Sequence, residues 1–354
     1  MTPTANLKMR FFDAHCDTVM PALESGLDFV KGGPQAHLDL PRLQAAGHCV
    51  QLFAVFTARD EFPGVDLTAY ADQAIATIHG WADSADGAFR IALTSADLRA
   101  ACQGEGVWGL IGLEGADPLG DSADNLERYY RAGVRSLIPA WDDNAFSGAA
   151  TGSSGPLTAE GVRLIEAAEG LRVMVDVSHL SDKGFWQLCD IVHRPFIASH
   201  SNCRALCPTP RNLTDEMIRA IAERGGVIGI NLAPNFLDPD YLSAFVAVTA
   251  PARAAAAADR QQVWDALSEQ LGSIPLPGIE WVVRHTRHII EIGGEECIGL
   301  GGDLDGITAM PAGITGVESY PLLAEMLAVA GLTQAQVEKV CWKNMARVFC
   351  EVLG

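Results

Sequence analysis

Val107-Trp108-Gly109-Leu110-Ile111-Gly112-Leu113-Glu114-Gly115 is an unbroken apolar run that ends in a carboxylate. Its length is that of a β-strand, and the lack of polar alternation is typical of a strand buried on both faces in a parallel sheet. A carboxylate buried at the end of such a strand is costly unless it is paired or bound to a metal. The stretch therefore predicts a parallel strand that delivers Glu114 to a polar site.

Other apolar runs of strand length share this pattern, and helical patterns separate them. They lie at Met9–Phe12, Cys49–Phe56, Val134–Ala140, Arg172–Val177, Phe196–Ser199, Val227–Asn231 and Cys297–Gly301. Helices are expected at Leu67–Ala82, Asn125–Ala132, Ala159–Ala168 and Asp215–Arg224, with helix starts at Ser181-Asp182 and Thr214-Asp215-Glu216. Eight such strands alternating with helices predict an α/β fold, a closed (β/α)8 TIM-type barrel, and an open doubly wound sheet is the alternative.

The long stretch 236–277 breaks this rhythm after the seventh predicted strand. It contains the alanine run Ala254–Ala258 and a helical pattern at Gln261–Leu271. We interpret 236–277 as an insertion that serves as a lid or an oligomer contact. Because no internal repeat or linker divides the chain, residues 1–354 are expected to form a single barrel domain.

The composition excludes several classes of partner. The formal net charge of −19 makes nucleic acid and anionic lipid poor partners. No window approaches about 18 uninterrupted apolar residues, and Met1–Arg10 lacks a signal-peptide core, so no membrane anchor is expected. The nine cysteines are scattered, and we expect reduced thiols in a cytoplasmic protein.

Metal-ligand residue types follow several of the predicted strands, at the barrel end that carries the reactive groups of such enzymes. His15 and Asp17 follow the first strand, and residues two apart in an extended segment face the same side. Glu114, His179 and His200 follow the third, fifth and sixth strands. Taken singly, each has an ordinary reading as a surface, core or capping residue, but their shared position at strand ends favours a site.

This set suits two metal ions with mixed nitrogen and oxygen ligands, for which zinc is the natural choice. A bridging Glu114 could hold the ions a few ångströms apart, as in two-metal hydrolases. Asp303 follows the eighth strand and is not needed as a ligand, so it is free for proton transfer. We assign no role to the remaining histidines: His37, His48, His79, His193, His285 and His288.

The ordered motifs resemble the membrane (renal) dipeptidase family, within the amidohydrolase-type metal barrels, nearly from end to end. The matching motifs are Asp13-Ala14-His15-Cys16-Asp17, His37-Leu38-Asp39-Leu40-Pro41-Arg42-Leu43, Gly112-Leu113-Glu114-Gly115, Gly155-Pro156-Leu157-Thr158, Val175-Asp176-Val177-Ser178-His179, Ser199-His200-Ser201, Arg211-Asn212-Leu213, Gly301-Gly302-Asp303-Leu304-Asp305-Gly306 and Asn344 with Arg347-Val348. Each motif alone is common, and the combination is specific.

The resemblance implies a zinc-dependent dipeptidase with two zinc ions per chain, and it suggests a homodimer. His15 and Asp17 would bind one ion, His179 and His200 the other, and Glu114 would bridge them. A hydroxide bridging the metals would attack the peptide carbonyl, and Asp303 would pass its proton to the leaving amine. Arg211 would pair with the C-terminal carboxylate of the dipeptide substrate through its bidentate fork.

Trp141 departs from the family pattern. Better-known members carry a histidine there, after the fourth strand, that contacts the carbonyl oxygen of the substrate. An indole N–H donates one hydrogen bond and carries no charge. Trp141 is therefore a candidate substrate-binding residue whose alternative is packing at the barrel rim.

Two other functions compete with a dipeptidase. One is another amidohydrolase-type metal hydrolase that acts on N-acyl amino acids or related amides. The other is a binding protein on the same barrel without metal, which loss of a ligand would indicate. No ligand is missing from the set above.

Overall fold

Nine parallel strands form one sheet in the computed structural model, which describes residues 9–33, 36–104, 106–254, 266–267 and 269–354. They are β1 (Phe11–Cys16), β2 (His48–Phe56), β3 (Phe89–Ile91), β4 (Val107–Glu114), β5 (Val134–Ile138), β6 (Met174–Val175), β7 (Ile197–Ala198), β8 (Val227–Ile230) and β9 (Ile298–Leu300). Their order is β6-β5-β4-β2-β1-β9-β8-β7, and β3 pairs with β4 outside this path.

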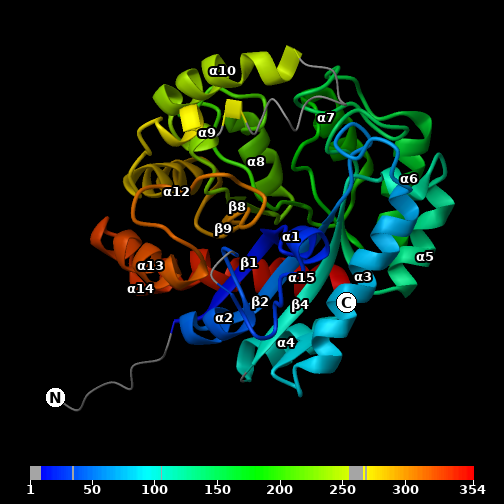
Figure 1. Ribbon diagram of the computed structural model, residues 1–354, viewed down its shortest axis with the longest axis horizontal. Coiled ribbons are helices and arrows are strands. Elements are labelled where there is room, and N and C mark those ends of the chain that lie inside the picture. The colour runs from blue at the N-terminus through cyan, green and yellow to red at the C-terminus, as the bar shows by residue number, and fades with distance from the viewer. Residues whose placement is uncertain (1–8, 34–35, 105, 255–265, 268) are drawn as a thin grey trace.

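The two ends of the sheet meet. Asp176, directly after β6, forms a parallel bridge with Ile197 in β7, and the Val177 N–H donates to the Ile197 carbonyl at 2.8 Å. The strands other than β3 therefore form a nearly closed parallel barrel of eight strands, with helices around it (Figure 1). The predicted (β/α)8 fold is confirmed, and the open doubly wound sheet is excluded.

The helices of the outer layer begin where the sequence supplies caps. Thr214 caps α8 through Met217 N–H, and Ser181 caps α7 through Gly184 N–H, as predicted. The helices are α1 (Val19–Ser25), α2 (Leu40–Ala46), α3 (Leu67–Ser84), α4 (Ser95–Gln103), α5 (Leu126–Arg131), α6 (Ala159–Leu171), α7 (Asp182–Ile191), α8 (Asp215–Glu223), α9 (Pro234–Leu237), α10 (Pro239–Ala254), α12 (Glu280–Gly293), α13 (Tyr320–Val329), α14 (Gln334–Glu338) and α15 (Asn344–Leu353).

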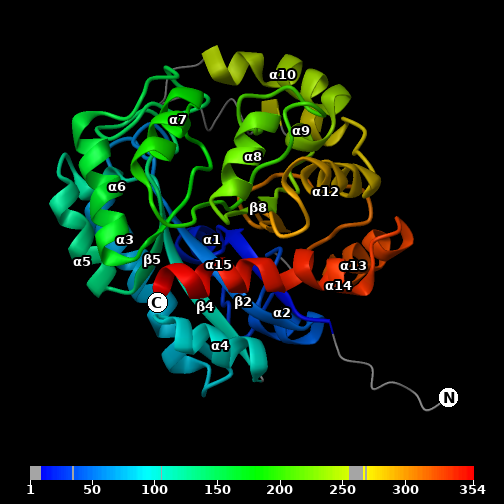
Figure 2. The same ribbon diagram turned by 180° about the vertical axis from the view of Figure 1, so that it is seen from behind.

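Helix α15 covers the end of the barrel where the strands begin. Its side chains Met345, Val348 and Phe349 pack against the first residues of the strands, and the Phe349 and Phe12 rings stack at 5.4 Å. Figure 2 shows α15 crossing in front of β2 and β4. Because this apolar layer fills one end, the polar site can open only at the other.

The insertion follows β8, the seventh predicted strand. It takes in the end of α9 and the whole of α10, and these two helices pack on each other at the edge of the molecule in Figure 1. Of the alanine run 254–258 and the helix predicted at 261–271, residues 255–265 and 268 lie outside the described residues, while 266–267 and 269–271 are helical. Among the described helices, none combines the length and apolar character needed to cross a bilayer.

Gly115 allows strand β4 to end directly at the carboxylate of Glu114. Its φ is +87°, a left-handed value that glycine adopts without strain. A Cβ there would lie 2.0 Å from the Thr57 carbonyl oxygen, so a side chain would collide with the backbone of the neighbouring segment. Gly115 therefore lets the chain turn away immediately after Glu114.

Candidate metal centre

The predicted ligands converge at the carboxyl ends of the strands. His15 lies at the end of β1, Asp17 directly after it, and Glu114 is the last residue of β4. His179 and His200 follow β6 and β7. All five side chains are buried, and they come from four strands of the barrel.

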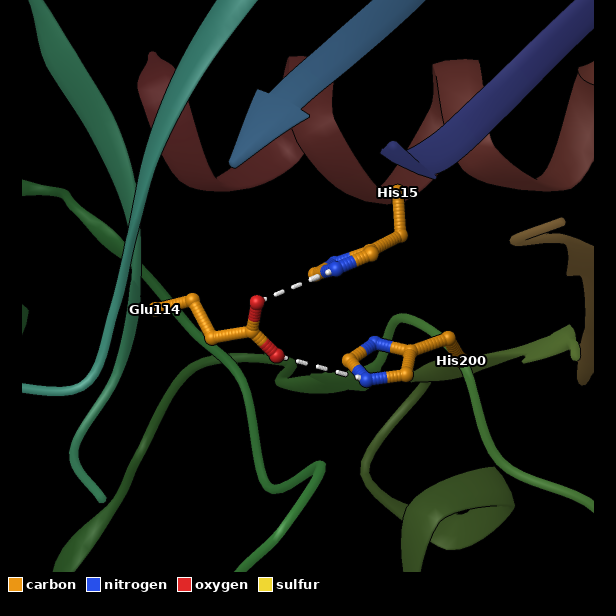
Figure 3. A group of neighbouring side chains, drawn as sticks. All are labelled: His15, Glu114 and His200. Carbon is orange, nitrogen blue, oxygen red and sulfur yellow. Dashed lines mark ion pairs between the residues drawn. The ribbon is translucent and has the colours of Figure 1, made fainter. Parts of the chain in front are cut away.

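The carboxylate of Glu114 lies between two groups of ligands (Figure 3). Its Oε2 is 3.3 Å from His15 Nε2, which is 3.4 Å from Asp17 Oδ2. Its Oε1 is 3.0 Å from His179 Nε2 and 3.5 Å from His200 Nε2. One oxygen therefore faces each half of the predicted site, as a bridging ligand requires.

The donors fit metal ions better than they fit one another. His15 Nε2 and Asp17 Oδ1 are buried and form no hydrogen bond in the described part of the chain. The Nε2 atoms of His179 and His200 point at each other across 2.8 Å. Donor atoms of His15, Glu114 and His200 lie within 4.8 Å of one another. Buried imidazole and carboxylate donors gathered this closely form a ligand set that suits divalent transition metals.

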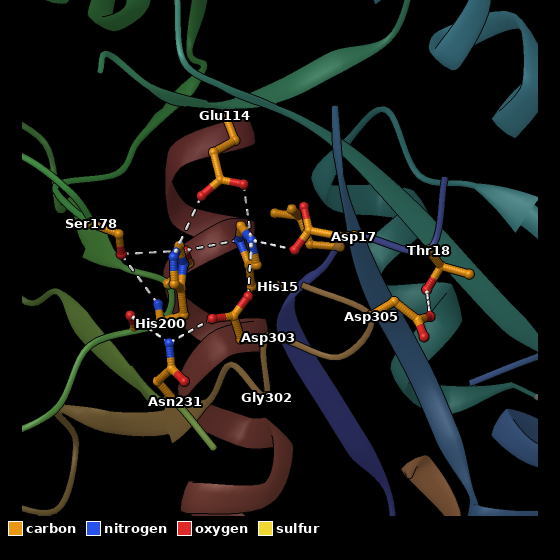
Figure 4. A network of polar contacts seen from close by, with 12 residues as sticks. His15, Asp17, Thr18, Glu114, Ser178, His200, Asn231, Gly302, Asp303 and Asp305 are labelled. Carbon is orange, nitrogen blue, oxygen red and sulfur yellow. Dashed lines mark hydrogen bonds and ion pairs between the residues drawn. The ribbon is translucent and has the colours of Figure 1, made fainter. Parts of the chain in front are cut away.

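Asp303 also reaches this centre. Its Oδ1 is 3.9 Å from His15 Nε2, and it forms a second cluster of possible ligands with His15 and Asp17. Its Oδ2 accepts a hydrogen bond from Asn231 Nδ2 at 2.8 Å (Figure 4). The structure thus places Asp303 beside the ligands with one oxygen held by an amide.

Burial and mutual charge set the protonation of these groups. Burial, together with the charge of Glu114, raises the pKa of Asp17 to about 8. Burial lowers the pKa of His179 to about 3, and Arg211 adds to this shift. Burial would raise the pKa of Glu114, but His15 and His179 outweigh it and hold that pKa below its ordinary value. Neutral His179 and ionised Glu114 are the forms that ligate metal.

Two further buried carboxylates hold the ligand segments in place. Asp13 accepts from the His15 N–H at 2.8 Å and from the Gly302 N–H at 3.0 Å, and it binds the Tyr320 hydroxyl. Asp176 Oδ1 accepts from the Ser178 N–H at 2.9 Å and from the Ser199 N–H at 3.0 Å. Each carboxylate ties a ligand-bearing strand end to its neighbour.

Asp13 and Asp176 play no part in the site predicted from the sequence. A pattern in the sequence could have identified them as supports of the site: each is an acidic residue in or directly after an apolar strand, two or three positions before a histidine. Ser199 was missed as well: its hydroxyl lies 2.8 Å from His200 Nδ1, so it leaves the other imidazole nitrogen, Nε2, facing Glu114.

His37, to which we assigned no role, supports the loop that carries Asp303. The Asp305 N–H donates to His37 Nδ1 at 2.9 Å, and Asp305 Oδ1 accepts from the His37 N–H at 2.6 Å. Asp303 and Asp305 have φ of +60° and +65°, and His179 has +72°. Non-glycine residues in this region cluster at functional sites.

Two cavities open onto the centre. The acidic cavity, of about 310 Å³, is lined by Asp17, Glu114 and Asp303 together with apolar side chains that include Met20 and Phe56. The arginine cavity, of about 590 Å³, is lined by Arg211 and by residues of α10 and of the loop after β7. Both cavities share a wall: Trp141, His179, Asn235, Phe236 and Phe245.

Arg211 is a buried cation without a full set of partners. Its Nη2 donates to the His200 carbonyl at 3.3 Å, while its Nε has no hydrogen-bond partner among the described residues. Its guanidinium lies 5.3 Å from the centre of the Phe236 ring. Burial lowers its pKa to about 10, although nearby carboxylates counteract this. Such a group suits an anionic ligand.

Trp141 lies in the wall between the cavities. Its ring meets Phe56 edge to face at 5.0 Å and lies 5.6 Å from the His179 ring. It is half-buried. Trp141 therefore has packing partners and also reaches both cavities. Its contact with the substrate stays a prediction.

The sequence matches a known protein family over almost its whole length. The sequence profile described as "Membrane dipeptidase (Peptidase family M19)" matches residues 5–353. An uncharacterised Klebsiella pneumoniae protein encoded in the pqqA 5′ region is 34% identical over 275 residues, 75% of this chain and 90% of that protein.

Solved structures agree in fold. A metallopeptidase called dipeptidase AC is 27% identical with a TM-score of 0.84, over 98% of this chain and 99% of that chain. A Rhodobacter sphaeroides metallopeptidase, liganded with a phosphinate mimic of L-Ala-D-Ala, is 26% identical with a TM-score of 0.82 over the same shares. The chain belongs to the membrane dipeptidase family, peptidase family M19, and is a metal-dependent dipeptidase.

Proposed function

We propose that this dipeptidase holds two zinc ions per chain. His15 and Asp17 would hold one ion, His179 and His200 would hold the other, and Glu114 would contribute one oxygen to each. The observation that carries this proposal is the division of the Glu114 oxygens, with Oε2 toward His15 and Oε1 toward His179 and His200.

Zinc in such a site would supply an activated water and polarise the scissile carbonyl. Asp303 would hold a proton beside the ligands and deliver it to the leaving amine. Its placement supports this role, because Asn231 holds Oδ2 while Oδ1 faces the ligands.

Arg211 binds the C-terminal carboxylate of the substrate, and Trp141 contacts the substrate from the shared wall. The burial of Arg211 supports the first assignment, as does its Nε, which has no hydrogen-bond partner in the part of the chain that the structure describes. Asp303, the acidic-cavity carboxylate that this assignment leaves off the metals, can receive a free ammonium group at the other end but gains nothing from an N-acyl group, which favours dipeptides over N-acyl amino acids.

Elemental analysis of the purified protein together with a hydrolysis panel tests the proposal. We expect two zinc ions per chain and cleavage of dipeptides but not of N-acetyl amino acids. Glu114→Ala is expected to lose both ions or to bind them at scrambled positions, because one residue serves two metals. Full zinc occupancy in that variant would contradict the bridging role.

Three expectations from the sequence stay predictions: a single domain, a homodimer and a cytoplasmic location. Light scattering after size-exclusion chromatography decides between monomer and dimer. Cell fractionation decides the location.

A further inference from the structure

Helix α10 touches both cavities through neighbouring side chains. Tyr241 lines the acidic cavity alone, Leu242 and Val246 line the arginine cavity alone, and Phe245 lines both. Tyr241 and Phe245 are four residues apart, on one helix face, and their rings stack at 6.3 Å. One helix of the insertion thus forms part of two separate walls.

The charges of the two cavities match a zwitterionic dipeptide in one orientation. Asp303, which the proposed site leaves off the metals, lines only the acidic cavity, and Arg211 lines only the arginine cavity. Glu61 also lines the arginine cavity, but it is exposed and therefore more strongly screened by solvent than the buried Arg211. The ammonium end then lies in the acidic cavity and the carboxylate end in the arginine cavity.

His179 lies in the wall that both cavities share, so the peptide bond between the two ends passes the metal ligands. The side chain of the N-terminal residue then meets the apolar surface of the acidic cavity, formed by Met20, Phe56 and Tyr241. The side chain of the C-terminal residue meets Leu242 and Val246.

We propose that α10 determines the substrate selectivity of this dipeptidase. Tyr241 recognises the side chain of the N-terminal residue, and Leu242 with Val246 recognises that of the C-terminal residue. The preferred substrates are dipeptides with apolar side chains at both positions. This inference rests on the proposed function, because the orientation follows from Arg211 as the carboxylate contact.

Two dipeptide series test the assignment, one with glycine, alanine, leucine or phenylalanine before alanine and one with the same residues after alanine. Tyr241→Ala is expected to lower kcat/KM for the leucine and phenylalanine members relative to glycine by about tenfold in the first series only. Leu242→Ala is expected to lower kcat/KM for the leucine and phenylalanine members, relative to glycine, in the second series only. Ser243→Ala, at an exposed position of the same helix outside both cavities, is the matched control.

A binding measurement separates recognition from folding and from turnover. Calorimetric titration with phosphinate analogues of the same dipeptides should give Kd values that change between the series members by the same factors as kcat/KM. Tyr241→Phe keeps the aromatic ring and should retain the wild-type preference. Equal changes in both series, or unchanged ratios, overturn the assignment while dipeptide cleavage stands. If the wild type cleaves no dipeptide, the proposed function fails and the assignment fails with it.

Discussion

Glu114 and Asp303 are both buried carboxylates at strand ends, yet their surroundings differ. Three imidazole nitrogens lie within 3.5 Å of the Glu114 oxygens, whereas Asp303 has an amide on one oxygen and its nearest imidazole nitrogen at 3.9 Å from the other. A residue whose oxygens face imidazoles on both sides is suited to ligation. A residue with one oxygen beside the cavity is suited to moving a proton.

Asp303→Asn tests that distinction. Asparagine tolerates the left-handed backbone at φ +60°, so the loop is expected to keep its conformation. Loss of a proton-transfer group should lower kcat by about 10²-fold or more. Steady-state kinetics and zinc analysis measure the two effects. Zinc loss in parallel with activity would instead identify Asp303 as a ligand.

Arg211 gives the second residue-level prediction. A bidentate contact to a free carboxylate away from bulk water should make a dipeptide amide a poor substrate compared with the free dipeptide. Arg211→Lys should weaken turnover of the free dipeptide, because an ammonium cannot reproduce the fork. The ratio of kcat/KM for acid over amide is the measurement, and Arg211→Ala should abolish the preference. A wild type that cleaves both equally well contradicts the role.

The convergence of the candidate ligands could be predicted from the sequence because each follows an apolar strand, and strand ends of a parallel barrel meet at one edge. The sequence could not predict which groups Asp13 and Asp176 support. Their role depends on backbone N–H groups of Gly302 and Ser199 in neighbouring strands, and strand pairing over such separations is not visible in local patterns.

At the scale of elements, Asp176 connects the two segments that carry His179 and His200. Asp176→Ala would leave the Ser178 and Ser199 N–H groups buried without an acceptor, at a cost of about 1–3 kcal/mol each. We expect metal affinity to fall by about 10–100-fold, as for other groups that orient ligands. Competition with a chelator measures this.

Asp176→Asn is the matched control, because its amide oxygen can still accept both hydrogen bonds. It should keep most of the affinity that the alanine variant loses. Wild-type metal affinity in the alanine variant would show that the histidine segments are held by other contacts.

Element boundaries were predicted less well than element types. Strand β1 continues to Cys16, beyond the predicted Phe12, because Asp13 and His15 are polar yet buried at the metal centre. Strand β6 is shorter than predicted, since Arg172 ends α6 in a left-handed conformation. Strand β3 was missed because three residues carry too little periodicity.

At the scale of the whole molecule, His48 should make folding sensitive to acid. It is buried between the rings of Phe11 and Tyr320, and neither ring nitrogen has a partner in the described part of the chain. Burial lowers its pKa to about 3. As pH falls below about 6.5, the unfolded chain binds a proton that the folded chain does not, so stability is lost with decreasing pH.

The expected loss from this residue is about 1.4 kcal/mol per pH unit between about pH 6 and 4. His48→Phe should show a correspondingly shallower decline in the free energy of unfolding, measured by urea titration at several pH values. His193→Phe, at an exposed position, is the control. Parallel pH profiles for wild type and His48→Phe would rule out this contribution.

The position of β1 in the barrel has a consequence for the order of folding. Its neighbours are β2 and β9, and Asp13 pairs with Leu300. A chain leaving the ribosome can build β1, β2 and β4 from nearby segments, but the other edge of β1 stays open until residues near 300 have emerged. Pairing over such a separation is slow, and an open apolar strand edge recruits other chains. Because Asp303 follows β9, the same pairing brings Asp303 to the candidate metal centre and covers the open edge of β1.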